Sequence, residues 1–445
     1  MRARAISGQR LADILTQPAI LLTLCVLTIF RAVGFLTLWG RAYHNDFDVF
    51  YSAAVAYRHG FNPYTADLTA IGQRLGFHLG PLRHSTDTPF ALLLFLPFSF
   101  AAVPSAHTIW IAMNFAAFAA ALYVLLAPRF SGFDLRMALV LAALAILYAP
   151  VTEDFLFSQR QTVILLLLVL TMRALERRRE AAAGVLLSLA VAYRAFPILM
   201  AGYFVVRRQW RVLIYMSCGL ALIGGATVAM LGLPVCVGYV SGMRFATTAF
   251  WQDPANVSLR GFLDRFFFYA GGPARGGLLE LLHSVSMVCA EIVILALAVW
   301  PTYQRRLRPD LDRPTYSLWV AASIILSPLS WIHYMVLLLI PFTEIAACGQ
   351  RHECSSRAAW AALASYLIVS LSRLVRKPVV GAVLWDQGAK FLAEGSILAL
   401  MVGFFAVLWF ATDAIGSAGS NRLEPAFLAA EPPDLSASQG VAARS

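Results

Sequence analysis

The sequence is poor in charge. Only 13% of its 445 residues are Asp, Glu, Lys or Arg, whereas a soluble globular domain has about 25%. Hydrophobic residues make up 60% of the chain, and the mean hydropathy is +0.70. This composition excludes an ordinary soluble domain and predicts an all-α, polytopic membrane protein.

Lysine is almost absent. Of the 35 basic residues only Lys377 and Lys390 are lysine, so arginine carries the net charge of +11. The arginines cluster at the ends of apolar stretches, as the positive-inside rule describes for cytoplasmic loops. We therefore expect no nucleic-acid partner. The clusters are Arg2, Arg4 and Arg10; Arg177, Arg178 and Arg179; Arg207, Arg208 and Arg211; Arg305, Arg306 and Arg308; and Arg351 and Arg357.

The sequence also lacks a metal-binding or disulfide pattern. The six cysteines lie mostly within apolar stretches and form no paired framework. Cys348, His352 and Cys354 fall close together, but no fourth ligand accompanies them. No carboxylate cluster demands a metal either. The sequence therefore predicts no metal and no cofactor.

Long apolar stretches define the fold. Each candidate span is near the ~20 residues that cross a bilayer. Two further stretches are interrupted, 90–104 by Pro97 and Pro104, and 182–206 by Arg194 and Pro197. Together they predict about twelve transmembrane helices. The uninterrupted spans are 18–40, 106–127, 136–151, 158–174, 211–234, 278–300, 315–330, 331–348, 358–373 and 393–414.

The arginine clusters set the topology. With all of them in the cytoplasm, residues 1–414 form one transmembrane domain with large outer loops at 41–89 and 235–277. The stretch 182–206 must then form two half-length helices that return to the same side, and 90–104 must be re-entrant or interfacial. The Ser-, Ala-, Gly- and Pro-rich tail 415–445 is expected to be disordered and cytoplasmic.

Polar residues from six separate segments map to the outer face or reach toward it. A charge near the hydrocarbon is costly and usually faces a cavity. These residues are therefore the candidates for a functional site. They are Asp46 and Asp48; Arg83, His84 and Asp87; Glu153, Asp154, Gln159, Arg160 and Gln161; Arg194; Trp251, Asp253, Asn256, Ser258 and Arg260; and Ser327, Ser330, Trp331 and His333.

Their chemistry suits transfer of a sugar from a lipid-linked phosphate. Arginine binds phosphate through a fork of donors, and a carboxylate can take a proton from a sugar hydroxyl. Amides and aromatic rings hold sugars, and aliphatic walls hold a lipid tail. Structural alternatives remain, because either aspartate could cap a helix, Arg194 could snorkel, and His333 could be a packing residue.

At these positions the chain resembles glycosyltransferase family 87, the polyprenyl-phosphate-mannose-type mannosyltransferases with the GT-C membrane fold. The resemblance covers roughly residues 40–345. The chain departs from the family pattern at several positions: Asp87 stands where the family has an aromatic residue, Ser158 replaces glycine, Gln161 replaces an asparagine, and Arg194 replaces lysine. The elements that carry the resemblance are Asp46-Phe-Asp-Val-Phe50, Gly60-Phe-Asn-Pro-Tyr64, Asp87-Thr-Pro89-Phe90, Ser158-Gln159-Arg160-Gln161, Arg194-Ala-Phe-Pro197, Asn256-Val-Ser258-Leu259 and Ser327-Pro-Leu-Ser-Trp-Ile-His333.

The resemblance implies roles for these residues. Asp46 aligns with the family's proposed catalytic aspartate and would act as general base. Residues two apart on a helix do not share a face, so Asp48 is expected to cap the helix or contact substrate instead. Arg194 and Arg260 would bind the donor phosphate. The remaining acceptor or substrate contacts would be Trp331, His333, Gln159, Asn256 and Ser258.

The implied function is a hexosyl transfer with inversion. The sugar, mannose by resemblance, would move from a polyprenyl-phosphate donor to a glycolipid or glycan acceptor. The reaction would take place among the membrane lipids, at the outer face of a bacterial inner membrane that the chain crosses many times. The alternative is a polytopic lipid or solute transporter, or flippase, without transferase activity. A transporter is expected to show internal repeats, and we find none in the sequence.

Overall fold

The computed structural model describes residues 16–39, 46–79, 84–127, 135–251, 253, 256–268, 276–307, 312–350, 356–375 and 396–413. In these residues the regular elements are helices, and the β-structure is one isolated bridge between Asn256 and Trp331. The all-α prediction is confirmed. The predicted tail 415–445 lies outside the described residues, as do Arg83, His352 and Cys354.

Six helices of the described part are long and apolar enough to cross a membrane. A seventh span is formed if α7 (Leu135–Leu147) and α8 (Ala149–Leu156), bent by 48°, count as one. The predicted number of about twelve spans is therefore not confirmed. The six are α2 (Pro18–Trp39), α6 (Val103–Leu126), α12 (Trp210–Leu231), α15 (Gly277–Gln304), the segment Ile332–Gly349 and the helix Ser396–Asp413.

Two predicted spans are shortened by polar turns. The predicted span 158–174 is α9 (Gln161–Glu176), and 315–330 is α16 (Arg313–Leu326). At 16 and 14 residues they are about 24 and 21 Å long, less than the ~30 Å of hydrocarbon. The turns before α9 and after α16 carry candidate site residues.

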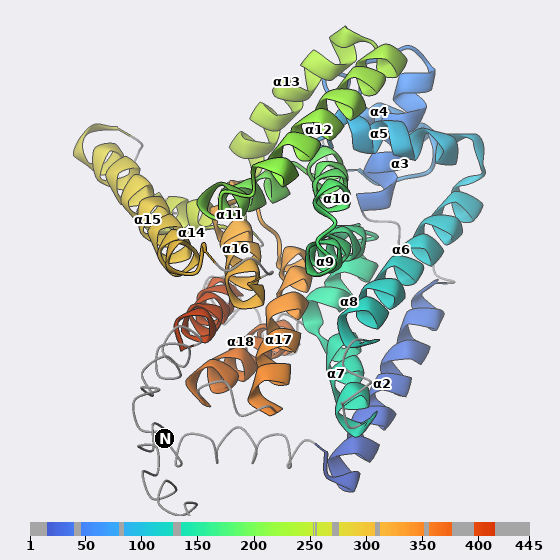
Figure 1. The fold of residues 1–445 in the computed structure, drawn as a ribbon. Coiled ribbons are helices and arrows are strands. Elements are labelled where there is room, and N and C mark those ends of the chain that lie inside the picture. The colour runs from blue at the N-terminus through green and yellow to red at the C-terminus, as the bar shows by residue number, and fades with distance from the viewer. Residues whose placement is uncertain are drawn as a thin grey trace, which may run out of the picture.

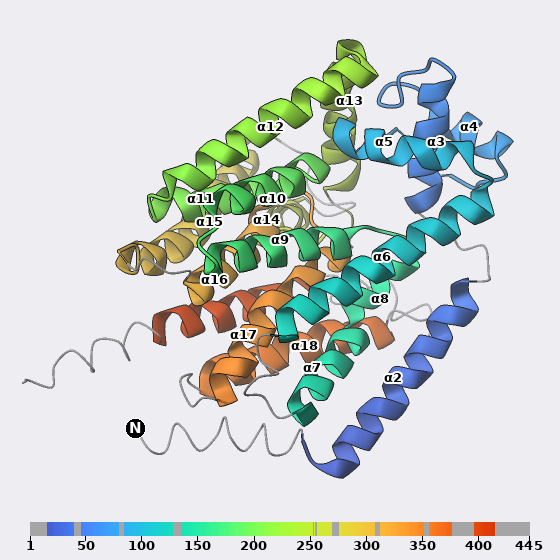
Figure 2. The same cartoon turned by 45° about the vertical axis from the view of Figure 1, so that its right-hand side comes forward.

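The core of the molecule is built around α9. It lies between α6 and α10 (Glu180–Tyr193), as Figure 2 shows, and buries Ile164, Leu165 and Leu168 completely. The side of α10 that faces away from α9 packs closely on α12. A Cβ at Gly184 would lie 2.6 Å from the Val212 carbonyl oxygen, so glycine is needed there. α10 is thus packed between α9 and α12, and it ends at Tyr193, directly before the site residue Arg194.

The stretch 182–206 breaks at Arg194, as predicted. After α10 the chain turns into the 3₁₀-helix η3 (Phe196–Met200) and α11 (Ala201–Val206), with Pro197 in the first turn of η3. The Arg211 guanidinium lies 3.8 Å from the Glu180 carboxylate. Both ends of the broken stretch therefore lie at the same end of the molecule, which confirms the pair of half-length helices.

The N-terminal segment 46–100 forms a compact helical layer at the opposite end (Figure 1). It contains α3 (Asp46–Arg58), α4 (Leu68–Arg74), α5 (Pro89–Phe95) and the 3₁₀-helix η1 (Leu96–Phe100). α3 ends before Gly60, whose φ of +80° favours glycine, as predicted. The apolar helix Pro89–Phe100 is about 18 Å long and too short to cross, as expected for a re-entrant or interfacial segment.

The remaining helices complete the described fold. α13 (Leu233–Phe250) and α14 (Leu259–Phe267) follow α12, and η4 (Ile332–Leu338), α17 (Leu339–Gln350) and α18 (Ser356–Val375) follow α16. Cys348 in α17 is disulfide-bonded, so the expectation of no paired cysteines is wrong at this position.

Candidate active site

A cavity of about 550 Å³ opens where α3, η3, α13 and the turn 327–331 meet. One part of its wall is polar and the other is apolar. Of the predicted site residues, the cavity brings together Asp46, Gln159, Arg194, Trp331 and His333. Further polar side chains on the wall are His84, Asp87, Glu153, Tyr239, Asp253 and Tyr334, and the apolar wall includes Phe196, Ile198, Leu199, Met243, Phe250 and Leu326.

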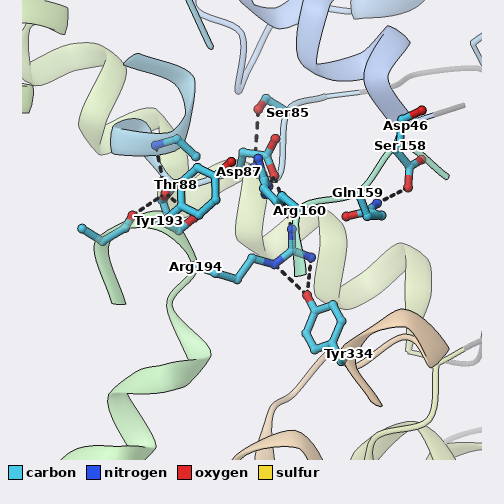
Figure 3. A network of polar contacts seen from close by, with 12 residues as sticks. Asp46, Ser85, Asp87, Thr88, Ser158, Gln159, Arg160, Tyr193, Arg194 and Tyr334 are labelled. Carbon is cyan, nitrogen blue, oxygen red and sulfur yellow. Dashed lines mark hydrogen bonds and ion pairs between the residues drawn. The ribbon is translucent and has the colours of Figure 1, made fainter. Parts of the chain in front are cut away.

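Asp46 is the first residue of α3, and its side chain faces the cavity. Gln159 donates a hydrogen bond from Nε2 to the Asp46 carboxylate (Figure 3). Asp48 does not line the cavity, as expected from the helical spacing of the two carboxylates. Burial, reinforced by the charge of Asp46, raises the pKa of Asp48 to about 7. The two carboxylates therefore occupy different environments.

A strained turn presents Gln159. Ser158 has φ +51°, a left-handed conformation that costs an L-residue energy. Two side chains of α6 hold it: His107 Nε2 lies 3.0 Å from Ser158 Oγ, and Trp110 donates from Nε1 to the Ser158 carbonyl at 2.8 Å. The Asp154 carboxylate accepts a hydrogen bond from the backbone N–H of Gln161 at 3.0 Å and so caps the start of α9. The turn is thus fixed at both ends.

A charged network occupies the centre of the site. Asp87, just before α5, forms an ion pair with Arg160, and Arg194 Nη1 lies 3.7 Å from the same carboxylate. Arg194 also donates from Nε to the Tyr334 hydroxyl at 2.7 Å (Figure 3). Arg194 lines the cavity and keeps 18% of its side chain exposed. Its guanidinium therefore remains accessible to an anion.

Trp331 ends the turn 327–331 after α16, and His333 lies in the first turn of η4, which follows it. Asn256 holds the turn 327–331, because its Oδ1 accepts from the amides of Ser258 and Ser330, both at 3.1 Å. Ser258 also donates from Oγ to the Pro328 carbonyl at 3.2 Å. Asn256 and Ser258 are fully buried and do not line the cavity. Both side chains therefore hold the turn 327–331 from behind the cavity wall.

Arg260 lies apart from Arg194. Its guanidinium stacks on the Trp251 ring at 4.4 Å from the centroid, and it is not among the cavity residues. The structure thus brings one of the two predicted phosphate-binding arginines to the cavity.

Three residues of the charged network, Asp87, Arg160 and Tyr334, were given no role by the sequence analysis. Asp87 and Arg160 stood among the polar candidates, but their pairing across 73 residues has no sequence signal. Tyr334 directly follows His333 and reads as part of an apolar helix. The signal for Arg160 as a candidate was its place in a polar stretch between two apolar spans. In the described part of the chain, no group of three His, Cys, Asp or Glu residues is placed to hold a metal ion.

Comparison with known proteins identifies the family of this chain. The sequence model of "Glycosyltransferase family 87" matches residues 86–328. The chain is 27% identical over 270 residues to a polyprenol-phosphate-mannose-dependent alpha-(1-2)-phosphatidylinositol mannoside mannosyltransferase of Mycolicibacterium smegmatis, covering 58% of each protein. The same-named protein of Mycobacterium tuberculosis is 23% identical over 346 residues, which is 72% of this chain and 75% of that protein.

The alignment with the first relative thus spans less than two thirds of its length. Among solved structures, the apo crystal structure of ArnT from Cupriavidus metallidurans is similar at a TM-score of 0.35 and 13% identity, covering 89% of this chain and 78% of ArnT. That similarity is too low to support a structural argument. The family match spans more than half of the sequence, and the chain therefore belongs to glycosyltransferase family 87.

Proposed function

We propose that this protein transfers a hexose, namely mannose, from a polyprenyl-phosphate sugar to a glycolipid or glycan acceptor at the outer face of the bacterial inner membrane. One observation carries the proposal. A single cavity holds a carboxylate, Asp46, and an accessible guanidinium, Arg194, beside an apolar wall. These groups match an acceptor hydroxyl, a phosphate and a lipid chain, respectively.

Asp46 acts as the general base. It takes the proton of the acceptor hydroxyl while that oxygen forms a bond to the anomeric carbon. The bond between that carbon and the phosphate oxygen breaks, and its electron pair leaves with the polyprenyl phosphate. Attack opposite to the leaving group inverts the anomeric centre. The hydrogen bond from Gln159 orients the Asp46 carboxylate toward the cavity.

Arg194 stabilises the leaving group. The phosphate gains negative charge as the glycosidic bond breaks, and a guanidinium already in place lowers the energy of that state. The neutral Tyr334 hydroxyl holds Arg194 without cancelling its charge. Trp331 and His333 line the same cavity and contact the acceptor or sugar in this proposal. Asn256 and Ser258 act from behind the wall by holding the turn 327–331.

The names of the relatives support the choice of substrates. Both are described as dependent on polyprenol-phosphate-mannose and as acting on phosphatidylinositol mannoside. Mannose is therefore the first sugar to test. The corresponding acceptor class is a glycolipid with a free sugar hydroxyl.

The transporter alternative requires a path to the other side of the membrane. At the far end of α9, Glu176 pairs with Arg313 at 2.8 Å, and Arg313 lies 3.3 Å from Glu344. Arg305 pairs with Asp312 nearby in the chain at 2.9 Å. Since α9 rises 1.5 Å per residue, this network lies about 22 Å from the cavity end of the helix. It favours a cavity that opens to one side.

A reconstitution experiment tests the proposal. Proteoliposomes are supplied with polyprenyl-phosphate mannose labelled in the sugar, and in parallel with the arabinose and glucose lipids. The expected result is a labelled glycolipid with inverted anomeric configuration. Movement of intact donor across the bilayer without a transfer product would support the transporter and reject the transferase.

A further inference from the structure

Asp87 is a buried carboxylate shared by two guanidiniums. It is 7% exposed, pairs directly with Arg160, and lies 3.7 Å from Arg194 Nη1. A buried carboxylate needs a cation close by, because burial without one is costly. Which arginine satisfies Asp87 therefore decides how much of the positive charge remains for a ligand.

Arg160 is confined away from the cavity. Only 1% of its side chain is exposed, and it is absent from the cavity wall. The Phe50 ring lies 4.6 Å and the Tyr193 ring 5.3 Å from its guanidinium carbon. Arg160 is thus held between two aromatic faces and points at Asp87. It is placed to neutralise Asp87 and cannot itself reach a ligand in the cavity.

Arg194 is held much less tightly by Asp87. Its hydrogen bonds go to the neutral Tyr334 hydroxyl, and the 3.7 Å separation from Asp87 is longer than a direct hydrogen bond. The distance between the two segments is also fixed. Thr88, next to Asp87, donates from Oγ1 to the carbonyls of Ala192 and Tyr193 at 2.6 and 3.2 Å. Asp87 therefore remains beside Arg194 whether or not a ligand is present.

We propose that Arg160 is a positioning residue that occupies Asp87 and so leaves Arg194 available for the donor phosphate. This proposal rests on the proposed function, because it needs a phosphate at Arg194. Without Arg160, Arg194 becomes the nearest cation to a buried carboxylate. The phosphate must then compete with Asp87 for the same guanidinium.

Binding of a long-chain polyprenyl phosphate to the full chain in nanodiscs tests this inference without any transfer reaction. Arg160→Met is expected to weaken binding about tenfold, in the range of coupling between contacting charges. Asp87→Asn alone is expected to bind at least as well as the wild type. The double variant Arg160→Met/Asp87→Asn is expected to recover wild-type affinity, because no carboxylate then competes.

The rescue separates positioning from folding. If Arg160 served only to stabilise the fold, the double variant would recover melting temperature while the affinity of each folded variant stayed at the wild-type value. The matched control is the buried pair Arg305–Asp312, at the other end of the molecule. Arg305→Met/Asp312→Asn is expected to change stability and leave polyprenyl phosphate binding unchanged.

Besides wild-type affinity of a folded Arg160→Met variant, two results would overturn the inference. One is weaker binding by Asp87→Asn, a variant that can be measured even if Arg160→Met does not fold. The other is a folded double variant that binds as weakly as Arg160→Met. Failure of the wild type to bind polyprenyl phosphate would instead reject the proposed donor, so the two proposals fail in different ways.

Discussion

Gln159 donates a hydrogen bond to the carboxylate of Asp46 across 113 residues of sequence. The donor sits in the turn before α9, and the acceptor is the first residue of α3. This contact joins the N-terminal helical layer to the core of the molecule. Asp46, and not Asp48, is the carboxylate of α3 that lines the cavity.

Removal of this contact should slow the reaction. A hydrogen bond to a charged group contributes about 1.5–3 kcal/mol, so Gln159→Leu is expected to lower kcat at least about tenfold. The KM for the donor should change little, because Gln159 does not contact Arg194. The matched control is Gln161→Leu. The Gln161 side chain is fully buried, and its carboxamide group has no hydrogen-bond partner among the described residues. Equal losses in both variants would argue against a special role for Gln159.

The turn that carries Gln159 should tolerate glycine and reject a β-branched residue. Ser158 has φ +51°, which glycine adopts freely and valine does not. Ser158→Gly loses the contact with His107 but relieves strain, so folding and transfer should be nearly retained. Ser158→Val should lose about 1–3 kcal/mol of stability, and the transfer rate should fall. Thermal unfolding and initial rates of the two variants give the comparison. Wild-type behaviour of Ser158→Val would show that the turn is not strained.

The sequence predicted the break at Arg194 and the different environments of Asp46 and Asp48, but it did not predict the number of spans. The break at Arg194 and the opposite directions of Asp46 and Asp48 followed from a charge in an apolar stretch and from helical phase. The span count was not confirmed, because hydropathy does not reveal that polar turns shorten α9 and α16. The sequence also did not show that Asn256 and Ser258 hold the turn 327–331 and do not line the cavity. Composition shows that a polar residue is present, but only packing shows which side of a turn it faces.

Asp48 should make stability depend on pH. Its pKa is about 7 in the folded chain and near the ordinary 3.8 when unfolded, so the folded state binds the extra proton between these values. Stability therefore falls as pH rises from about 4 to 7 and then levels off. Asp48→Asn mimics the protonated form, and its advantage in melting temperature over the wild type should grow through the same window. A constant difference from pH 5 to pH 8 would contradict the raised pKa.

Asn256 should matter for both stability and transfer. Its Oδ1 accepts from two buried amides, those of Ser258 and Ser330. Asn256→Ala leaves both unpaired and should cost about 1–3 kcal/mol of stability. Because Ser330 lies in the turn before Trp331 and His333, the KM for the acceptor should rise in the folded fraction. The control is Asn62→Ala, which removes a bond to the Pro234 carbonyl at 3.1 Å. An unchanged acceptor KM in Asn256→Ala would mean that the turn keeps its position without the clamp.

The most direct measurement of the central claim compares Asp46→Asn with Asp48→Asn. Each is reconstituted at equal folded amount and supplied with labelled polyprenyl-phosphate mannose and glycolipid acceptor. Asp46→Asn should bind polyprenyl phosphate normally and lose transfer by at least about a hundredfold, in line with removal of a general base. Asp48→Asn should retain transfer. Full transfer by Asp46→Asn, together with its loss in Asp48→Asn, would contradict the assignment of Asp46 as the base.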